Sequence, residues 1–361
     1  MSGISKFIVS IASVVIGLIF GALLMFAFGY DPITGYESLY QGAFGNPFSV
    51  GQTVRAATPL IFTGLGFAVA YTAGFFNIGL AGQALWGWFA SVWVGLMFPN
   101  APIWIVLPLA IVTGALAGAL WAAIAGVLKA YFNTSEVIVT IMLNYISIYI
   151  VDYLIRYVLT DKADRTPSIG ANASLKIAWL SELTNNSTIH GGVFLAIVAA
   201  IIVAILMART VTGFELKSVG LNPHASNYAG MSAKKNIILA MCISGALAGL
   251  GGVMNGLGEF GFINLQNGVA PAIGFNGMAV ALLGINHPIG IIFAAFLFGA
   301  LETGASTMAL FAKIPSEIVD IVIGIIIFFV GANYIITYFL ERSKKRKSLH
   351  QSKLGQEGGE L

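Results

Sequence analysis

The sequence predicts an all-α polytopic membrane protein that crosses the bilayer about ten times. Hydrophobic residues make up 58% of the 361 residues and charged residues only 9%, whereas soluble domains average about 25% charged residues. The apolar residues also fall into long runs, and a run of about 20 spans the hydrocarbon core as a helix. Because these runs take up most of the chain, no soluble catalytic domain fits, and function is expected in the membrane or in short loops.

Ten apolar runs are candidates for membrane spans. The first is longer than about 20 residues and has no small-residue cleavage site, so we interpret it as a span rather than a signal peptide. The runs at 82–98 and 271–286 contain glycines, so either can be re-entrant or broken. The predicted spans are residues 7–29, 55–73, 82–98, 103–128, 137–159, 191–208, 236–257, 271–286, 288–308 and 317–340.

The distribution of basic residues predicts which span ends face the cytoplasm, because Lys and Arg near span ends collect there. The basic cluster from Arg342 to Lys347 places the C-terminus inside, and ten spans then place the N-terminus inside as well. On this assignment twelve basic residues lie inside and five outside. We expect a transmembrane domain over residues 1–340, with 209–235 as a cytoplasmic loop within it, and a basic then polar, disordered cytoplasmic tail over 341–361.

The glycine-rich stretch Tyr71–Gly87, YTAGFFNIGLAGQALWG, lies where one span should end and the next begin. In lipid, free backbone groups cost several kcal/mol each, so non-helical backbone survives only inside protein or beside a wet cavity. The stretch therefore predicts a lining of a translocation path, with Phe76, Asn77 and Gln83 as candidate contacts. Close packing of helices through small residues explains the same glycines equally well, so both interpretations stay open.

A second stretch, Asn133–Ile155, begins with a Thr-Ser pair that can cap a helix. Asn144 lies about two turns into this helix, where an amide either contacts the substrate or hydrogen-bonds a neighbouring helix. Near the other end, Asp152 and Arg156 are four residues apart and can pair on one helical face. We interpret that pair as a local ion pair at the membrane interface.

A third stretch, Asn255–Gly284, contains seven glycines and five side-chain amides. This composition fits a loop that enters the mouth of a pathway, with Asn264 and Asn276 as candidate contacts. It fits an ordinary flexible outer loop equally well. Glu259 has no partner apparent in the sequence, so we expect it to face water.

The polar segment Arg209–Lys235 is too long for a turn, and its Gly, Asn and Pro residues divide it into two predicted short helices. Its stretch FELKSVG predicts a short amphipathic helix, and GLNP then ends that helix and turns the chain. Asn222 can cap a second helix that has Pro223 in its first turn, a position that proline tolerates. Two short helices joined by a rigid turn form a lever. A segment that only connected two spans would not need residues that end one helix and cap the next.

The sequence lacks the residues of common enzyme sites. It has no Cys/His cluster with metal-ligand spacing and no glycine-rich loop followed by Lys-Ser or Lys-Thr for a nucleotide. Its four histidines are scattered and its acidic residues within spans are few, so no acid–base pair or proton relay is apparent. We therefore expect no enzymatic activity and no bound cofactor or metal. Proton-coupled transport stays open, but it lacks its usual residues, so we expect energy from another source.

Three strings, FNIGLAGQ, SEVIVTIMLNYI and GFELKSVGLNPHASNYAGM, together resemble the permease subunits of bacterial ATP-binding-cassette (ABC) importers. More narrowly, they resemble the branch that contains the ribose, nucleoside and branched-chain amino acid permeases. The likeness covers essentially the whole chain from the first span to the tenth. TSEVIVTIMLNYI is most similar to the nucleoside (guanosine-type) permeases, with the simple-sugar permeases next.

The resemblance implies a multi-pass protein of the bacterial cytoplasmic membrane, surrounded by lipid, that translocates nucleosides and binds no nucleic acid. Its pathway would form between two permeases, homologous or identical. An extracellular substrate-binding lipoprotein would supply the substrate, and a separate ATPase would use ATP and Mg²⁺. Within 209–235 the resemblance implies a coupling helix that docks on the ATPase, with the matching residues Gly213, Glu215, Leu216, Val219, Gly220, Asn222, Pro223, Ala225 and Gly230.

Two alternatives stay open from the residues. The substrate can be a simple sugar or a branched-chain amino acid, because amides and aromatic rings suit all three classes of solute. The scarcity of charged residues at span depth favours an uncharged one. The rival mechanism is an ion-coupled secondary transporter in which residues 209–235 only connect two halves.

Overall fold

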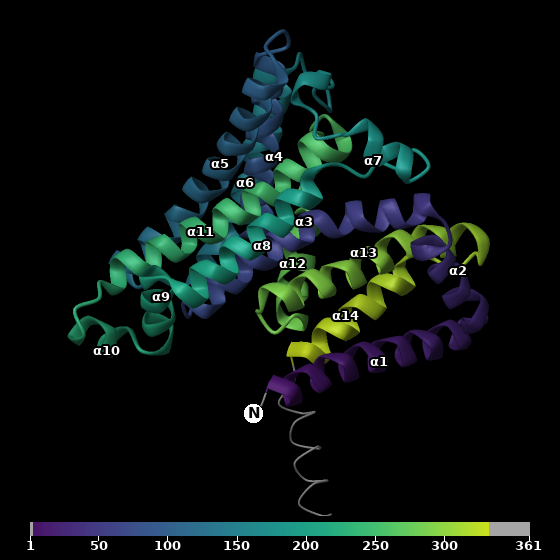
Figure 1. Ribbon diagram of the computed structural model, residues 1–361, viewed down its shortest axis with the longest axis horizontal. Coiled ribbons are helices and arrows are strands. Elements are labelled where there is room, and N and C mark those ends of the chain that lie inside the picture. The colour runs from purple at the N-terminus through teal and green to yellow at the C-terminus, as the bar shows by residue number, and fades with distance from the viewer. Residues whose placement is uncertain (1–2, 332–361) are drawn as a thin grey trace, which may run out of the picture. The chain divides into compact units, whose positions relative to one another are not determined.

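The computed structural model describes residues 3–331, and its regular structure there is helical apart from two isolated β-bridges (Figure 1). The α-helices are α1 (Gly3–Ala27), α2 (Pro32–Phe44), α3 (Pro47–Thr72), α4 (Leu80–Met97), α5 (Ile103–Phe132), α6 (Glu136–Leu154), α7 (Ala178–Leu183), α8 (Gly192–Arg209), α9 (Val211–Leu221), α10 (Pro223–Tyr228), α11 (Ala233–Val253), α12 (Ala272–Leu283), α13 (Pro288–Phe311) and α14 (Glu317–Gly331). The π-helical segments η1 (Ile155–Leu159) and η3 (Met254–Phe260) extend α6 and α11, and η2 (Ala171–Ala173) is a short 3₁₀ turn.

Eight helices of the described range are long and apolar enough to cross a membrane, and each matches a predicted span. They are α1, α3, α4, α5, α6 with η1, α8, α11 with η3, and α13. The other two predicted spans correspond to α12, which has only 12 residues, and to α14, whose predicted range continues beyond residue 331. The all-α polytopic class is therefore confirmed. The cytoplasmic location of the termini stays a prediction, and the predicted tail at 341–361 lies outside the described residues.

The described residues divide into two compact parts, 3–32 with 317–331 and 33–316. In the first part α1 packs along α14. Gly17 permits this approach, because a Cβ at that position would overlap the side chain of Ile326. All candidate site residues lie in the second part.

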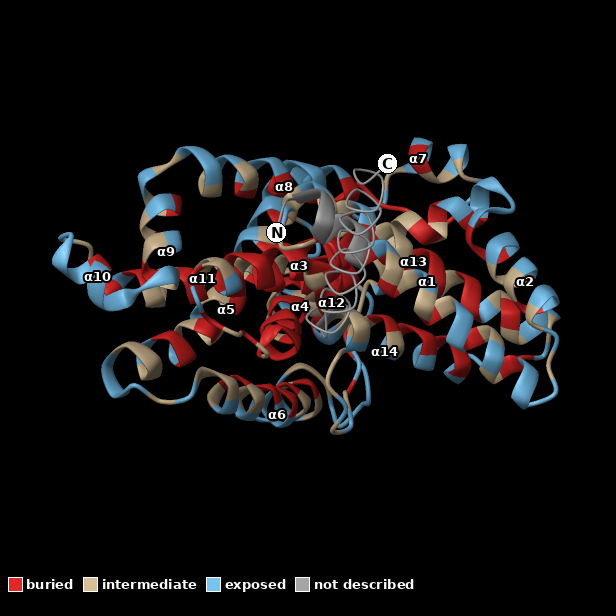
Figure 2. Cartoon of the chain, turned by 90° about the horizontal axis from the view of Figure 1, so that it is seen from below, coloured by how far each residue is buried: buried red, intermediate tan, exposed pale blue. Residues whose placement is uncertain are grey.

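The central helix of the second part is α3, which is buried along most of its length (Figure 2). Helices α8, α11, α12 and α13 pack on it, and α4 and α5 pack on α11. The contact between α5 and α11 depends on small residues four apart on both helices, Gly114 and Gly118 against Gly245 and Gly249. A Cβ at Gly118 would lie 2.8 Å from the Cα of Gly249. Glycines thus let these backbones approach closely, as is typical of membrane helices.

The helix α3 begins eight residues earlier than predicted, at Pro47 rather than at residue 55. Asn46 caps it by accepting a hydrogen bond from the Ser49 N–H at 2.8 Å. The first turns of α3 contain polar residues, so hydropathy alone did not indicate that the helix begins at Pro47. These polar residues form hydrogen bonds inside the protein. For example, the Thr53 hydroxyl donates to the Ala43 carbonyl at 2.9 Å. Arg55, which the sequence assigned to the outer loops, therefore lies about two turns inside the helix.

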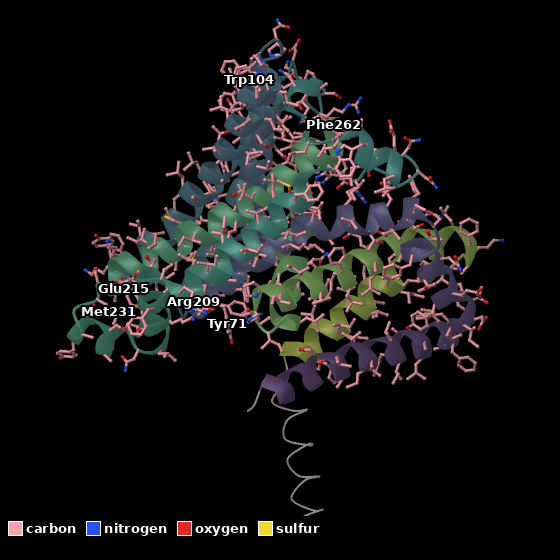
Figure 3. All side chains as sticks on the ribbon, in the orientation of Figure 1. Tyr71, Trp104, Arg209, Glu215, Met231 and Phe262 are labelled. Atoms are coloured by element: carbon pink, nitrogen blue, oxygen red, sulfur yellow. The ribbon has the colours of Figure 1, made fainter. Side chains whose placement is uncertain are left out.

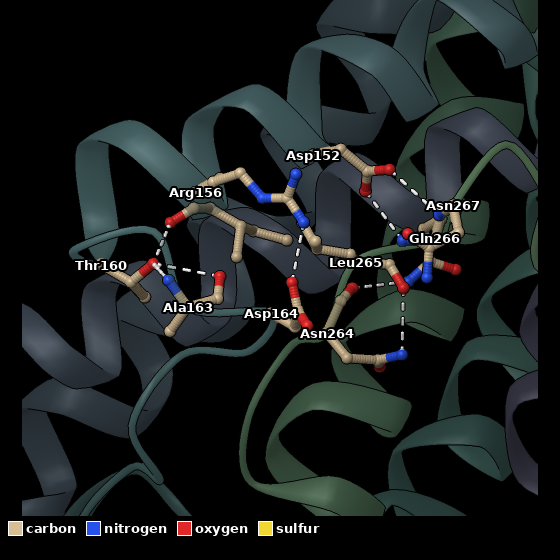
Figure 4. Close-up of polar contacts among 10 residues, drawn as sticks. Asp152, Arg156, Thr160, Ala163, Asp164, Asn264, Leu265, Gln266 and Asn267 are labelled. Atoms are coloured by element: carbon tan, nitrogen blue, oxygen red, sulfur yellow. Dashed lines mark hydrogen bonds and ion pairs between the residues drawn. The ribbon is translucent and has the colours of Figure 1, made fainter.

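The predicted ion pair between Asp152 and Arg156 does not form (Figure 4). The Asp152 carboxylate instead accepts hydrogen bonds from the backbone N–H groups of Gln266 at 2.7 Å and Asn267 at 3.0 Å. Arg156 lies in the π-helical turn η1 and pairs with Asp164 at 2.7 Å. The π-helical turn changes the helical spacing on which the prediction relied, and long-range partners compete for both charges.

Candidate functional site

The predicted lever in residues 209–235 is present as α9 and α10, which leave the bundle at one end (Figure 1). The Thr210 hydroxyl caps α9 by accepting from the Gly213 N–H at 3.1 Å. The Asn222 side chain caps α10 by accepting from the N–H groups of His224 and Ala225 at 3.0 and 3.1 Å. Pro223 occupies the first position of α10. The two-helix prediction and the cap at Asn222 are therefore confirmed.

Two contacts fasten α9 to the membrane helices. Gly220 lies against the backbone at the end of α3, where an added Cβ would be 2.7 Å from the Ala73 carbonyl carbon and closer still to the Thr72 carbonyl oxygen. On the other side, the Glu215 carboxylate accepts a hydrogen bond from Asn236 of α11 at 2.9 Å. α9 thus touches both α3 and α11, the two helices that cross the centre of the bundle.

The remaining predicted coupling residues divide into buried anchors and exposed positions. Leu216 and Val219 are buried against the bundle, and Gly213 lies against the Leu206 carbonyl where α8 turns into α9. Ala225 is exposed on α10, and Gly230 follows α10 with a positive φ of 84°.

Much of α10, at the tip of the lever, is exposed (Figure 2). Leu221, at the end of α9, is 89% exposed and Tyr228, at the end of α10, is 95% exposed. Both side chains are therefore accessible to a partner.

We call the end of the bundle that carries α9 and α10 the loop end, and the end where α3 begins and η3 finishes the far end. Figure 3 separates them: Tyr71, Arg209, Glu215 and Met231 lie toward the loop end, whereas Trp104 and Phe262 lie away from it.

Three of the predicted path residues, Asn77, Gln83 and Asn144, are close together and buried, with exposed fractions of 0%, 2% and 3%. The Asn77 amide nitrogen donates to the Gln83 side-chain oxygen at 2.9 Å and to the Ser244 hydroxyl at 2.8 Å. Asn144 accepts from the Gly82 N–H at 2.8 Å and donates to the Ile78 carbonyl at 2.9 Å. These amides hold the break between α3 and α4 against α6 and α11, and their contact with a substrate stays a prediction.

The other three predicted path residues do not join this group. Phe76 packs edge-on against Phe67, with 5.1 Å between the ring centroids. Asn264 is exposed in the segment after η3, where its side-chain nitrogen donates to the Leu265 carbonyl at 3.2 Å. Asn276 is half-buried on α12. The six candidates therefore do not form a single site.

A cavity at the far end was missed by the sequence reading. It measures about 510 Å³ and is lined by α3, η3 and α13, with Arg55, Glu259 and Glu302 among the lining residues. Arg55 and Glu259 form an ion pair and are each about four-fifths buried, with side-chain exposures of 19% and 21%. The expectation that Glu259 faces water without a partner is therefore wrong. The available signal was an arginine at the very edge of a predicted span, because charged residues within membrane spans are rare and usually functional.

His190 is buried beneath the far end, against Gly258 of η3. Burial, reinforced by the positive charges of Arg55 and Lys176, lowers the pKa of His190 to about 4. Below about pH 6.5 the His190 side chain takes up a proton in the unfolded chain, whereas in the folded chain it stays neutral down to about pH 4. The free energy of unfolding therefore decreases as the pH is lowered from about 6.5 to about 4, by up to roughly 3 kcal/mol. We expect thermal unfolding in detergent to show this loss, and His190→Asn to reduce it. An identical pH dependence in both proteins would contradict the assignment.

Among the described residues, no group of three or more His, Cys, Asp and Glu side chains is arranged to hold a metal ion.

The comparisons with known proteins agree on one family. Residues 49–331 match the family model described as the permease component of the branched-chain amino acid transport system. The guanosine ABC transporter permease protein NupP of Bacillus subtilis is 47% identical over 95% of this chain and 98% of its own length. The nucleoside ABC transporter permease protein NupB of Lactococcus lactis is 48% identical over 96% of this chain and 97% of its own.

A second permease of Bacillus subtilis is more distant. The guanosine ABC transporter permease protein NupQ is 30% identical over 74% of this chain and 85% of its own length. No solved structure matches the chain.

Proposed function

The chain belongs to the family of permease components of the branched-chain amino acid transport system, and we propose that it translocates nucleosides as one permease subunit of an ABC importer. It is a multi-pass protein of the cytoplasmic membrane. The lever formed by α9 and α10 carries the proposal, because a transporter that contained its own energy source would need no capped, anchored helix pair with an exposed apolar tip.

The proposed substrate follows from two relatives that resemble the chain along nearly all of its length. Both proteins at 47–48% identity are named for guanosine or nucleosides, and this chain aligns with almost the full length of each. The family description mentions branched-chain amino acids. Two near-full-length matches at this identity are the more specific guide, so we favour nucleosides over sugars and amino acids.

The proposed partners are an ATPase, a second permease and a substrate-binding lipoprotein. The ATPase would cover Leu221 and Tyr228 at the loop end, which then faces the cytoplasm, and would bind ATP and Mg²⁺ itself, so that this chain holds no cofactor and catalyses no reaction. The second permease would differ from this chain. This is supported by the two guanosine permeases of Bacillus subtilis, to which the chain is unequally similar, at 47% and 30% identity.

Competition for uptake tests the proposed substrate. Cells that express the complete transporter are supplied with labelled guanosine together with an excess of unlabelled inosine, ribose or leucine. We expect inosine to suppress uptake and ribose and leucine to leave it unchanged. Suppression by ribose or leucine, with no effect of inosine, would assign the transporter to one of the alternative substrates.

A further inference from the structure

The far-end cavity has the size and position of a small-molecule site. Its volume of about 510 Å³ falls within the roughly 300–1,000 Å³ of ligand pockets. Arg55 lies eight residues after the start of α3, about 12 Å along the helix at 1.5 Å per residue. The cavity therefore reaches into the span rather than resting on the surface.

Polar groups and aromatic rings line this cavity, and no aliphatic side chain larger than threonine does. Within the described residues, Arg55 Nε and the Thr303 hydroxyl are buried without a hydrogen-bond partner. Buried donors of this kind are rare in proteins unless a ligand or water satisfies them. The Gln52 side chain accepts from the Thr188 hydroxyl at 2.8 Å, which leaves its amide nitrogen to donate. A solute rich in hydroxyls and ring nitrogens suits these walls, whereas leucine would find no aliphatic surface.

Two phenylalanine rings, of Phe48 and Phe260, border the cavity. Phe260 stacks on Trp88, with 5.3 Å between the ring centroids and 17° between the planes. Trp88 is in turn held by a hydrogen bond from its indole N–H to the Phe262 carbonyl at 2.9 Å. A fixed aromatic ring favours stacking of a planar base, which contributes about 1–3 kcal/mol per base in other proteins.

The charge of the lining selects against phosphorylated solutes. Glu259 and Glu302 are two carboxylates against the single guanidinium of Arg55. A carboxylate accepts hydrogen bonds from ribose hydroxyls or from the N–H groups of a purine, but it repels a phosphate.

A second cavity adjoins the first. It measures about 500 Å³, includes Glu37 of α2, and shares Gly42, Phe48, Ser49 and Thr307 with the first cavity. A solute that enters from the segment joining α2 and α3 would therefore meet the second cavity beside the first.

The two helices that hold this ion pair are the two that α9 touches. Arg55 is on α3, whose other end lies against Gly220, and Glu259 is on the η3 extension of α11, whose other end donates from Asn236 to Glu215. A movement of α9 would therefore shift both sides of the cavity. This arrangement suits a site that must release its ligand when ATP is hydrolysed.

From these observations, and resting on the proposed function, we propose that the Arg55–Glu259 cavity is a binding subsite for uncharged nucleosides on the translocation path, entered from outside the cell. Arg55, Glu302 and the hydroxyl groups would hydrogen-bond the base and ribose, and Phe260 would stack on the base.

Equilibrium binding of labelled guanosine to the complete membrane complex in nanodiscs, without ATP and without binding protein, tests the subsite. We expect saturable binding that Arg55→Met and Glu302→Gln weaken by about tenfold or more. We also expect guanosine 5′-monophosphate to compete about tenfold less well than guanosine, and Glu302→Gln to narrow that difference. The matched control is Glu136→Gln, because Glu136 forms an ion pair of similar burial with Lys129 outside the cavity.

Several outcomes would overturn the subsite. If Arg55→Met and Glu302→Gln both bind guanosine with wild-type affinity, the binding site lies elsewhere. The same conclusion follows if Glu136→Gln loses as much affinity as they do. If Arg55→Met fails to assemble, Glu302→Gln decides the question, because Glu302 is exposed and the substitution leaves both members of the Arg55–Glu259 ion pair in place. ATP-driven uptake of guanosine by the wild type is measured in parallel. If the wild type takes up guanosine but the variants bind it as tightly as the wild type does, only the proposed subsite is contradicted. If the wild type takes up no guanosine, the proposed function is contradicted.

Discussion

Replacing Gly220 with alanine is expected to uncouple ATP hydrolysis from nucleoside transport. The added Cβ would lie 2.7 Å from the Ala73 carbonyl carbon and 2.9 Å from the Gly74 nitrogen, and these backbone atoms cannot rotate away. α9 must therefore move off the end of α3. Because displacements of about 1 Å can cost up to about a hundredfold in rate, we expect nucleoside-stimulated ATPase activity to fall by roughly tenfold or more.

The control for Gly220 is the same methyl group in open space. A Cβ at Gly324 of α14 meets no atom within 4 Å, so Gly324→Ala is expected to retain activity. Glu215→Ala tests the second anchor of α9 by removing the acceptor for Asn236, and it is expected to lower coupling without preventing membrane insertion. If Gly220→Ala and Glu215→Ala both transport and hydrolyse ATP normally, α9 does not couple the two activities.

Replacing Asn77 with leucine is expected to destabilise the fold more than any other single change considered for this protein. Asn77 is fully buried and satisfies the Gly79 N–H at 2.9 Å, the Gln83 amide and the Ser244 hydroxyl. Leucine has similar volume but no polar atoms, so three polar groups would be left buried without this partner. At about 1–3 kcal/mol for each stranded group, the loss is roughly 3–9 kcal/mol.

Thermal unfolding of the detergent-solubilised protein measures this loss. Asn264→Leu is the matched control, since that amide is exposed and bonds only within its own segment. A change in unfolding temperature no larger for Asn77→Leu than for Asn264→Leu would show that the network does not hold the α3–α4 break.

Local signals in the sequence were enough to predict the lever. The cap at Asn222, the proline that follows it and the Ser135 cap of α6, which accepts from the Ile138 N–H at 3.5 Å, each depend on residues a few positions apart. Helix caps and turns are decided by such neighbours. The membrane spans could also be predicted from the long apolar runs, because the thickness of the bilayer fixes the length of such a run.

The far-end cavity could not be predicted because its residues come from distant parts of the chain. Arg55 and Glu259 are about 200 positions apart, and hydropathy alone ended the span at Arg55 instead of continuing the helix to Pro47. Asn77 was recognisable as an unusual amide, but its partner Ser244 is 167 residues away. Polar residues in a membrane bundle are stabilised by partners from other helices, which a single sequence does not identify.

We expect this chain to move nucleosides only when a separate ATPase drives it. Proteoliposomes containing this chain and a second permease, with and without the ATPase, are loaded with ATP and Mg²⁺ on the side where α9 and α10 are exposed, and labelled guanosine with its binding protein is added on the other. Uptake is expected only when ATPase, ATP and binding protein are all present, and no uptake is expected when an ion gradient replaces the ATPase. Guanosine uptake driven by an ion gradient in the absence of the ATPase would contradict it.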